Sequence, residues 1–259
     1  MSRLPITPVM LTWNEAANIE RSLARLGWAE RVVVVDSGST DGTRELALRH
    51  ANVRLLTRPF DLHCAQWEFA VRHPDVDTDW VLALDADYVL TPGLIEELER
   101  VEASPGVGGF RVRFRYCVDG RPLRASLYPP VVVLFDRRRA HYVQDGHTQR
   151  LLVEGEVRDL PGEILHDDRK PLERFVEAQG RYARLEAARI RSTRWAALPW
   201  SGRVRRLRVV APWLAPFWAL IGRGVILDGR AGIAYARQRW IAEAAIARAL
   251  SRSASRSSE

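Results

Sequence analysis

The sequence is poor in cysteine, in signal-like apolar segments and in long hydrophobic runs. Its two cysteines, Cys64 and Cys117, have neither the spacing of a metal site nor a disulfide framework, so we expect a reducing compartment. The first residues contain no apolar signal core before a cleavage site, which predicts a protein that stays in the cytoplasm. The apolar stretch 209–221 has only 13 residues and contains Pro212 and Pro216. Because a spanning helix needs about 20 apolar residues, we expect no transmembrane segment there.

The charge is distributed unevenly along the 259 residues. Residues 1–168 contain 20 Lys and Arg against 26 Asp and Glu, whereas residues 169–259 contain 19 against 6. An acidic first part and a basic, aromatic second part suggest two different tasks. We therefore expect two regions, an α/β domain over 1–168 and a basic, Trp-rich helical region over 169–250, followed by a disordered tail over 251–259.

Strands and helices alternate in the first 100 residues. The apolar runs predict strands at 8–12, 31–36, 53–56 and 80–84, and helical spacing predicts helices at 16–26, 43–50, 64–73 and 91–101. Repeated βα units with continuous apolar strands imply a parallel sheet covered on both faces. Ligands of such sheets bind beyond the carboxyl ends of the strands.

The middle and the end of the chain have other patterns. Residues 109–118 alternate apolar residues with arginine, which predicts a half-buried strand at a sheet edge, and 131–136 reads as a further core strand. Residues 142–167 read as short strands and turns, and 171–191 as an amphipathic helix. The segment 195–229 combines tryptophans with arginines, which favours contact with an anionic bilayer surface. The alternative is that its Trp and Leu side chains pack a helical subdomain.

Carboxylates stand at the ends of two predicted strands. Asp85 and Asp87 follow the run 80–84, and Asp36 ends the run 31–36. Residues i and i+2 of an extended segment point the same way, so Asp85 and Asp87 can both reach one hard cation, which in turn takes phosphate oxygens. The alternative is a pair of helix-cap or turn residues. All three carboxylates are expected to share one crevice, because they lie at carboxyl ends of strands.

The loop after the first strand reads TWNE. We expect Thr12, Trp13 and Glu15 to line a nucleotide site, with Trp13 as a stacking face for a base, although a core tryptophan is an equally good interpretation. Asp36 precedes the turn SGSTDG and can accept the imide N–H of uracil or the edge of a guanine, whereas Asp41 fits an ordinary helix N-cap.

Four motifs, in this order and spacing, resemble those of family 2 glycosyltransferases with the GT-A fold. They are VMLTWNEAANIERSL, VVVVDSGSTDGT, AQWEFAV and DWVLALDADYVLTPGL. Weaker motifs extend the resemblance to about residue 250, toward the lipopolysaccharide core glucosyltransferases of the WaaE/KdtX type. They are VVVLFDRRRAHYV, GHTQRL, GEILHDD, QGRYARLEAA and GVILDGRAGI.

The resemblance implies that the first region, 1–168, is catalytic, and it implies a role for each matching residue. Asp36 would bind the base of a nucleotide sugar, with Trp13 beside that base. Asp85 and Asp87 match the DxD motif, with Asp87 the better metal ligand and Asp85 nearer the ribose and the metal. The cation, Mg²⁺ or Mn²⁺, would neutralise the leaving diphosphate.

The sequence departs from this family pattern at two places. Where the family often has a basic residue and an asparagine, this chain has Trp67 and Glu68, so that a phosphate contact is lost or is taken by an arginine of 137–139. In the acceptor motif VHE the glutamate is replaced by Thr148. An inverting transferase needs a general base, and Asp145 is the substitute we expect, although Asp-Gly is also a strong turn signal. His147 matches the motif and could contact the metal or the diphosphate, whereas His166 is given no role.

The leading hypothesis is an inverting, metal-dependent glycosyltransferase at the cytoplasmic face of the inner membrane, peripheral or monotopic. It would use a nucleotide-diphosphate sugar, preferably a UDP-sugar, and a lipid-linked or lipopolysaccharide-core-like acceptor. The alternatives are a catalytically impaired nucleotide-sugar or membrane-binding protein on the same scaffold, and a nucleotidyltransferase, although the N-terminal stretch has no Gly-rich phosphate loop. Nucleic-acid binding is not expected, because apolar runs interrupt the basic tail and no nucleic-acid module is recognisable.

Overall fold

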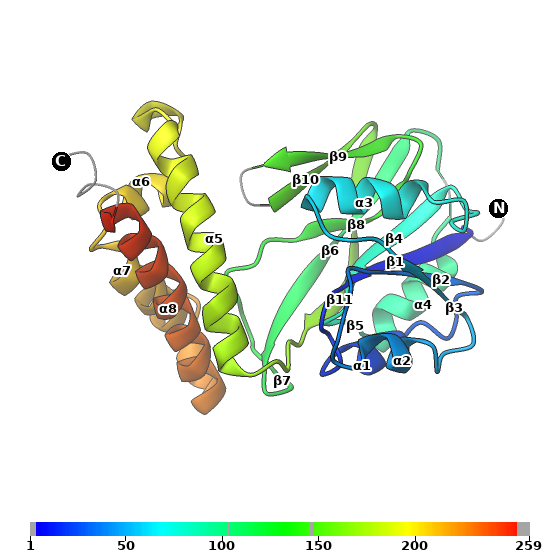
Figure 1. The fold of residues 1–259 in the computed structure, drawn as a ribbon, viewed down its shortest axis with the longest axis horizontal. Helices are drawn as coiled ribbons and strands as arrows, with labels where there is room; N and C mark the ends of the chain where they lie inside the picture. Colours follow the sequence, from blue (N-terminus) through cyan, green and yellow to red (C-terminus); the bar gives the residue numbers. More distant parts are fainter. Residues whose placement is uncertain (1–3, 103, 146–147, 253–259) are drawn as a thin grey trace. The chain divides into compact units, whose positions relative to one another are not determined.

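The computed structural model describes residues 4–102, 104–145 and 148–252 (Figure 1). The chain divides into two compact units. Unit 1 comprises residues 1–120 and 128–169, and unit 2 comprises residues 121–127 and 170–259. The segment 121–127, which the sequence placed in the first domain, thus belongs to the helical unit.

A mixed sheet forms the centre of unit 1, with the strand order β3-β2-β1-β4-β8-β6-β11-β5. Its strands are β1 (Ile6–Thr12), β2 (Val32–Asp36), β3 (Val53–Thr57), β4 (Trp80–Asp85), β5 (Tyr88–Leu90), β6 (Val107–Val118), β8 (Val131–Asp136) and β11 (Glu156–His166). Strands β3, β2, β1 and β4 are parallel, as expected from their continuous apolar runs. The parallel sheet inferred from the βα units is extended by strands of the other direction, since β8 runs antiparallel to both β4 and β6 and β5 runs antiparallel to β11.

The sequence suggested that the strand with alternating arginines lies at a sheet edge, but it is an interior strand. β6 lies between β8 and β11 and pairs with both. Its arginines remain exposed on one face, where Arg111 pairs with Asp159 at 2.6 Å and Arg115 pairs with Glu163 across the β6–β11 ladder. Cross-strand ion pairs of this kind allow one face of an interior strand to stay in water.

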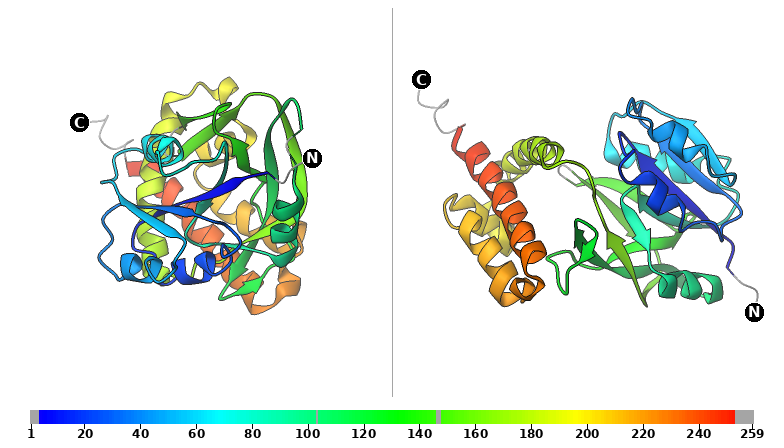
Figure 2. Two further views of the ribbon diagram at one scale, coloured as in Figure 1. Left: turned by 90° about the vertical axis from the view of Figure 1, so that its right-hand side faces the viewer. Right: turned by 90° about the horizontal axis from the view of Figure 1, so that it is seen from below.

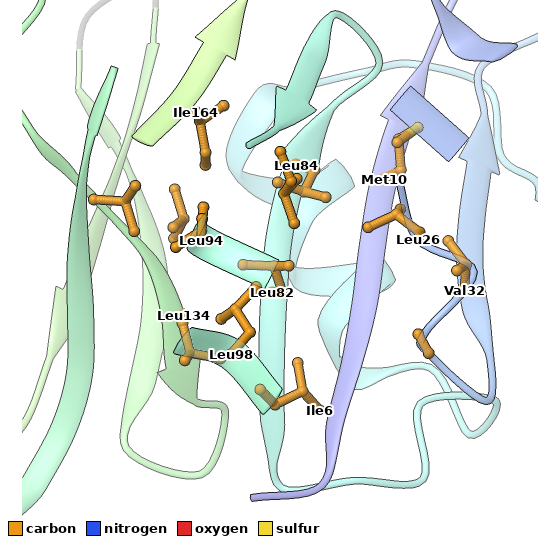
Figure 3. Close-up of a cluster of buried hydrophobic side chains, with 14 of the residues drawn as sticks. Ile6, Met10, Leu26, Val32, Leu82, Leu84, Leu94, Leu98, Leu134 and Ile164 are labelled. Carbon is orange, nitrogen blue, oxygen red and sulfur yellow. The ribbon is translucent and has the colours of Figure 1, made fainter. Parts of the chain in front are cut away.

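Helices cover both faces of the sheet. On one face α1 (Ile19–Leu23), α2 (Thr43–Ala47) and α4 (Pro92–Arg100) contribute to a core cluster that includes Leu82 and Leu134, both fully buried (Figure 3). The helix α4 begins as its sequence predicts, with Pro92 in the first turn and the Thr91 hydroxyl accepting the Leu94 N–H at 3.4 Å.

The other face carries α3 (His63–Arg72) and a separate two-stranded sheet of β9 (Ala140–Asp145) and β10 (Thr148–Val153). A second core cluster joins Trp67 and Val71 of α3 to Val9, Val33 and Phe135 of the sheet. Figure 1 shows α3 lying beside β9 and β10. The segment 142–167 was expected to form short strands and turns. Besides the hairpin strands it contains one long strand, β11, which belongs to the main sheet.

Unit 2 is helical. It contains the short β7 (Arg121–Pro122), α5 (Leu172–Ser192), η1 (Trp195–Ala197), α6 (Trp200–Arg206), α7 (Ala211–Phe217), the π-turn η2 (Trp218–Gly222), η3 (Val225–Asp228) and α8 (Arg230–Arg252). The two long helices, α5 and α8, pack side by side, and α7 packs against α8 (Figures 1 and 2). Pro216 lies inside α7 and removes a backbone donor there, which accounts for the break of the apolar segment into α7 and η2.

Candidate active site

The strand register places the predicted carboxylates at one edge of the sheet. In β1, Thr12 is opposite Asp36 of β2, and Leu11 is opposite Asp85 of β4. Asp36 and Asp85 thus lie at nearly the same level on either side of β1, at the carboxyl ends of three parallel strands. The register confirms that Asp36 and Asp85 lie at one edge of the sheet, where open α/β sheets bind their ligands, whereas the expected common crevice stays a prediction.

Asp36 shapes the turn that follows it. One carboxylate oxygen accepts the backbone N–H groups of Gly38 and Ser39, each at 3.0 Å, and the other accepts the Ser39 hydroxyl at 2.5 Å. The Asp36 side chain is fully buried, with the Arg44 guanidinium 3.9 Å from Oδ1. Asp36 therefore has a structural role in this turn, which the sequence interpretation missed. A contact of its carboxylate with a base stays a prediction.

The loop after β1 is tied to the same turn. The backbone N–H groups of Asn14 and Glu15 donate to Ser39 Oγ and Thr43 Oγ1, both at 2.8 Å, and Asn14 Oδ1 accepts the Thr40 N–H at 2.9 Å. These reciprocal bonds hold Asn14 in the left-handed region, at φ 54°. They also explain why α1 is shorter than the helix 16–26 expected from periodicity. The residues before Ile19 belong to the loop that is hydrogen-bonded to the turn after Asp36, an arrangement that we call the interlock.

Trp13 and Thr12 have contrasting environments. Trp13 is 48% exposed, so the interpretation as a core tryptophan is wrong and its indole is accessible to a base. Thr12 is 4% exposed, and its hydroxyl has no hydrogen-bond partner among the described residues. A buried hydroxyl of this kind at a ligand-binding edge has hydrogen-bonding capacity to offer.

Asp85 and Asp87 flank a buried alanine. Asp85 ends β4, Ala86 is 1% exposed, and Asp87 lies in the turn that leads into β5. Ala86 belongs to the core cluster, and Asp85 and Asp87 on either side of it are only partly buried. Asp87 is in a turn and not in an extended strand, so a common direction of the two carboxylates stays a prediction. Burial raises the pKa of Tyr88, and the charge of Asp85, to which the Tyr88 hydroxyl donates a hydrogen bond, raises it further.

His166 lies beside the DxD motif, a contact that the sequence interpretation missed. Its Nε2 is 3.1 Å from Oδ2 of Asp87, and both side chains are largely buried. Antiparallel pairing of β11 with β5 produces this contact, because His166 is the register partner of Tyr88. Burial alone would lower the pKa of His166, but the charge and hydrogen bond of Asp87 raise it above the usual value, with further help from Asp85 and Asp168. The signal in the sequence was the apolar segment of GEILHDD, which ends at a histidine as the other strands end at aspartates.

Three tyrosines surround the imidazole of His166. The rings of Tyr88, Tyr116 and Tyr128 lie edge-on to it, with centroid distances of 5.3, 5.0 and 5.2 Å. The Nδ1 atom of His166 is buried and has no partner among the described residues. The aromatic shell fixes the ring and leaves Nε2 directed at Asp87.

Asn18 connects the β1–α1 loop to the segment after His166. Its Nδ2 donates to Glu15 Oε2 at 2.8 Å and to Asp168 Oδ1 at 2.9 Å, and its Oδ1 accepts from the Arg169 N–H at 2.8 Å and the Arg21 guanidinium at 3.0 Å. Asn18 is 1% exposed, so this buried amide is fully bonded. Glu15, predicted in the nucleotide site, thereby belongs to the framework that holds the site together.

The two departures in α3 have a structural role. Trp67 is buried and stacks on Tyr142 of β9 at 5.4 Å with an interplanar angle of 18°, and Glu68 Oε1 accepts the Tyr142 N–H at 2.5 Å. Both side chains fasten the β9–β10 hairpin to α3. The hairpin end carries Asp145, whose backbone is the register partner of Thr148, but the side chain of Asp145 and all of His147 lie outside the described residues. Their catalytic roles stay predictions.

The arginines of 137–139 do not replace the missing phosphate contact. Arg138 pairs with Asp79 and Asp136, at 2.6 and 2.8 Å, and Arg137 donates to the carbonyl of Val71 at 3.0 Å. Asp136 is opposite Trp80, the first residue of β4, whereas Asp85 is the last. The arginines therefore lie at the amino end of β4, away from the carboxylate edge.

A divalent cation would find a partial ligand set at this edge. Among the described residues, no three His, Cys, Asp or Glu side chains gather closely enough to form a complete metal site. Asp87 and His166 are in contact and Asp85 is two residues away, so oxygen and imidazole ligands are present. Hard cations such as Mg²⁺ are commonly held by one or two carboxylates together with substrate phosphates, and the residues fit a cation of that kind.

Comparison with known proteins identifies the family. The model of the family "Glycosyl transferase family 2" matches residues 8–149, which contain most of β1, all of β2 and β4, and the DxD motif. The chain belongs to this family. It is a family 2 glycosyltransferase with a GT-A-like α/β fold, as the resemblance of its motifs predicted.

Individual relatives are more distant. The chain is 31% identical, over 118 residues, to the lipopolysaccharide core biosynthesis glycosyltransferase LpsC of Rhizobium meliloti, covering 44% of this chain and 43% of that protein. It is 36% identical over 100 residues to a glycosyltransferase of Rickettsia bellii, covering 38% and 33%. The match thus spans less than half the length of these relatives. The crystal structure of Staphylococcus aureus TarS 1–349 covers 99% of this glycosyltransferase and 92% of its own chain, at 12% identity and a TM-score of 0.48.

Proposed function

We propose that this glycosyltransferase transfers a sugar from a nucleotide-diphosphate sugar, with a UDP-sugar favoured, in a metal-dependent, inverting reaction. The acceptor would be lipid-linked or similar to a lipopolysaccharide core. The observation that carries the proposal is the contact of Asp87 with His166. Asp87 is two residues from Asp85, which lies at the same edge of the sheet as Asp36.

The donor would lie across the carboxyl ends of β1, β2 and β4. Trp13, exposed in the loop after β1, would supply a stacking face for the base, and Asp36 and Thr12 lie at the ends of the neighbouring strands β2 and β1. The diphosphate would then be near Asp85 and Asp87, where Mg²⁺ or Mn²⁺, when bound, neutralises the charge of the leaving group. His166 orients the carboxylate of Asp87 through Nε2.

The reaction is a single displacement. The acceptor hydroxyl gives its proton to a general base while its oxygen forms a bond to the anomeric carbon, and the bond from that carbon to the diphosphate breaks on the opposite side. Asp145, at the end of β9, is the base that we propose, and His147 would contact the diphosphate. The family's glutamate is absent here, because Thr148 occupies its position.

The acceptor side of the proposal rests on unit 2. Unit 2 exposes Trp200, Trp213 and Phe217 at 75%, 70% and 61%, an unusual number of large apolar side chains for a surface in water. In the described part of the chain, no helix has both the length and the apolar character needed to cross a bilayer. We therefore propose peripheral or monotopic attachment to the cytoplasmic face of the inner membrane. The LpsC relative, a lipopolysaccharide core enzyme by name, supports a glycolipid acceptor.

Thermal unfolding in the presence of nucleotides tests the donor site. We expect UDP with Mn²⁺, at 100 times its dissociation constant, to stabilise the protein by about 2.7 kcal/mol relative to the ligand-free state. GDP, CMP and dTDP at the same concentration should stabilise it less. Asp87→Asn should remove the metal-dependent part of the shift. The control is Asp77→Asn, since Asp77 is exposed, pairs with Arg31 and precedes β4 at the other end of the strand.

Turnover then separates the remaining alternatives. Release of UDP that depends on an acceptor glycolipid identifies the transferase, whereas nucleotide binding without turnover would support an impaired binding protein on this scaffold. A product containing a nucleotide in place of a sugar would indicate a nucleotidyltransferase. No stabilisation by any nucleotide would contradict the proposed donor site.

A further inference from the structure

One face of α8 combines exposed arginines with exposed apolar side chains. Arg230, Ile233, Arg237 and Trp240 follow each other at i, i+3, i+7 and i+10, which places them on one side of the helix. Ile233 is 60% exposed and Trp240 is 41% exposed. The opposite face is buried, with Tyr235 fully so. A stripe made of two cationic and two apolar side chains is therefore exposed to solvent.

A groove runs along this stripe. It has a volume of about 290 Å³ and is lined by Leu172 of α5 together with Arg230, Ile233, Ala234, Arg237 and Gln238 of α8. The lining is almost entirely apolar, so Arg230 and Arg237 contribute mainly their aliphatic stems to it, while both residues are exposed to solvent. A ligand that fits the apolar lining and these two arginines has an anionic group joined to an apolar chain.

The two guanidinium groups are not neutralised by the protein. Within the described residues, neither Arg230 nor Arg237 forms an ion pair, and the nearby Asp228 pairs with Arg124 at 3.0 Å. Arg205 of the same unit shows the contrast, because it contacts both Glu243 and Glu186, at 2.6 and 3.2 Å. The charge of the groove is thus available to a ligand.

The stripe continues into a larger apolar surface. Trp240 packs edge-on against Trp213 of α7, with ring centroids 6.4 Å apart. Trp213 is itself 70% exposed, and Phe217 and Trp218 farther along the same segment are 61% and 53% exposed. Arginine beside tryptophan is the composition that anionic bilayer surfaces favour.

The beginning of α8 is held firmly in place. A Cβ on Gly232 would lie 1.7 Å from the carbonyl oxygen of Val225, so η3 and α8 approach so closely that only glycine fits. The hydroxyl of buried Tyr235 accepts the Leu127 N–H at 3.0 Å. The groove is therefore formed before any ligand arrives, which lowers the cost of binding.

We propose that this groove binds the phosphate headgroup of an anionic phospholipid, with Arg230 and Arg237 on the phosphate and the acyl chain along Ile233 and Leu172. Arginines seven residues apart lie about 10 Å apart along the helix axis, which their long side chains can bridge. Guanidinium groups suit phosphate because they donate two parallel hydrogen bonds. The site deepens the membrane-attachment part of the proposed function and does not require sugar transfer.

Vesicle sedimentation tests the site. The full chain is mixed with vesicles of phosphatidylcholine alone or with one third phosphatidylglycerol, at fixed ionic strength. The groove variant Arg230→Ala/Arg237→Ala is compared with Arg184→Ala/Arg248→Ala, which removes two exposed arginines of the same unit outside the groove. We expect the groove variant to bind anionic vesicles about ten-fold more weakly than the wild type, and the control variant at most about two-fold more weakly.

Each outcome has a definite meaning. Equal losses in the two variants would overturn the proposal in favour of a diffuse charge effect. Stabilisation by inorganic phosphate that needs Arg230 and Arg237, without vesicle binding, would replace the lipid by a free phosphate. Tighter binding to an RNA oligonucleotide than to anionic vesicles would also overturn it. UDP binding, measured in parallel, should be unchanged in the groove variant, so that failure of the donor site is seen separately.

Discussion

Units 1 and 2 distribute apolar and charged side chains in opposite ways. Unit 1 buries its leucines and valines in two clusters and presents carboxylates at strand ends. Unit 2 contains a charged cluster in which the buried Glu186 contacts the partly exposed Arg189 and Arg205, and it exposes most of its tryptophans. In unit 1 the apolar side chains form a core that positions the carboxylates at the strand ends. In unit 2 many of the large apolar side chains are on the surface instead.

The largest effect should come from truncating the core of unit 1. Leu82→Ala removes a fully buried side chain and should lower the free energy of unfolding by about 4 kcal/mol, because it leaves a cavity. Leu227→Ala, at a side chain 68% exposed in unit 2, should change it by less than about 0.5 kcal/mol. Urea unfolding followed by circular dichroism measures both. Similar losses would show that Leu227 is buried in solution and would break the comparison.

The charged cluster of unit 2 should give the next largest effect. Glu186→Ala should cost about 3 kcal/mol, because Glu186 is 2% exposed and its loss deprives Arg189 and Arg205 of a partner. The matched control is Glu177→Ala, which removes exposed contacts with Arg174 and Arg181 and should cost less than about 1 kcal/mol. If the two substitutions cost the same in urea unfolding, the cluster is not a source of stability.

A smaller effect is expected at the buried amide of unit 1. Asn18→Asp keeps the shape of the side chain but directs a carboxylate at Glu15 and Asp168, so it should cost about 2 kcal/mol at pH 7. Protonation of these carboxyl groups relieves the repulsion, so the difference from the wild type should shrink as the pH falls toward 4. Urea unfolding of both proteins at several pH values measures this stability difference. A difference that grows in acid would contradict the proposed repulsion of the introduced carboxylate by Glu15 and Asp168.

The smallest effect concerns reactivity and not stability. Burial, together with the charge of Asp167, raises the pKa of Cys117 to about 12, so this thiol stays protonated at pH 8. Because the thiolate is the nucleophile, Cys117 should not react with a disulfide reagent in the folded protein at pH 7 to 9. The Cys64→Ser variant isolates this thiol. Its rapid labelling without denaturant would show that unit 1 opens at this strand.

The sequence predicted the parts of unit 1 that depend on local pattern. The parallel strands β1 to β4, the position of α4 after Thr91, and the common edge of Asp36 and Asp85 follow from apolar runs and from the rule for strand ends. The role of Glu68 could not be predicted, since it depends on the backbone of Tyr142, 74 residues away.

The contact of His166 with Asp87 escaped the sequence for a related reason. It needs β11 to pair with β5 in an antiparallel register, and the apolar segment before His166 does not show with which strand it pairs. The interior position of β6 was missed because its exposed arginines are paired across to β11, which local alternation cannot show. Long-range pairing, rather than propensity, determined these features.

The interlock between the loops at Asn14 and Ser39 has a consequence for recognition. Both loops are fixed by each other's hydrogen bonds, so their conformational entropy is lost when the chain folds and not when a donor binds. In the proposed donor site, a rigid rim of this kind would select among nucleotides by shape, because it would not adapt to a base that fits poorly. Fidelity toward the donor is thus a property that this enzyme would acquire on folding.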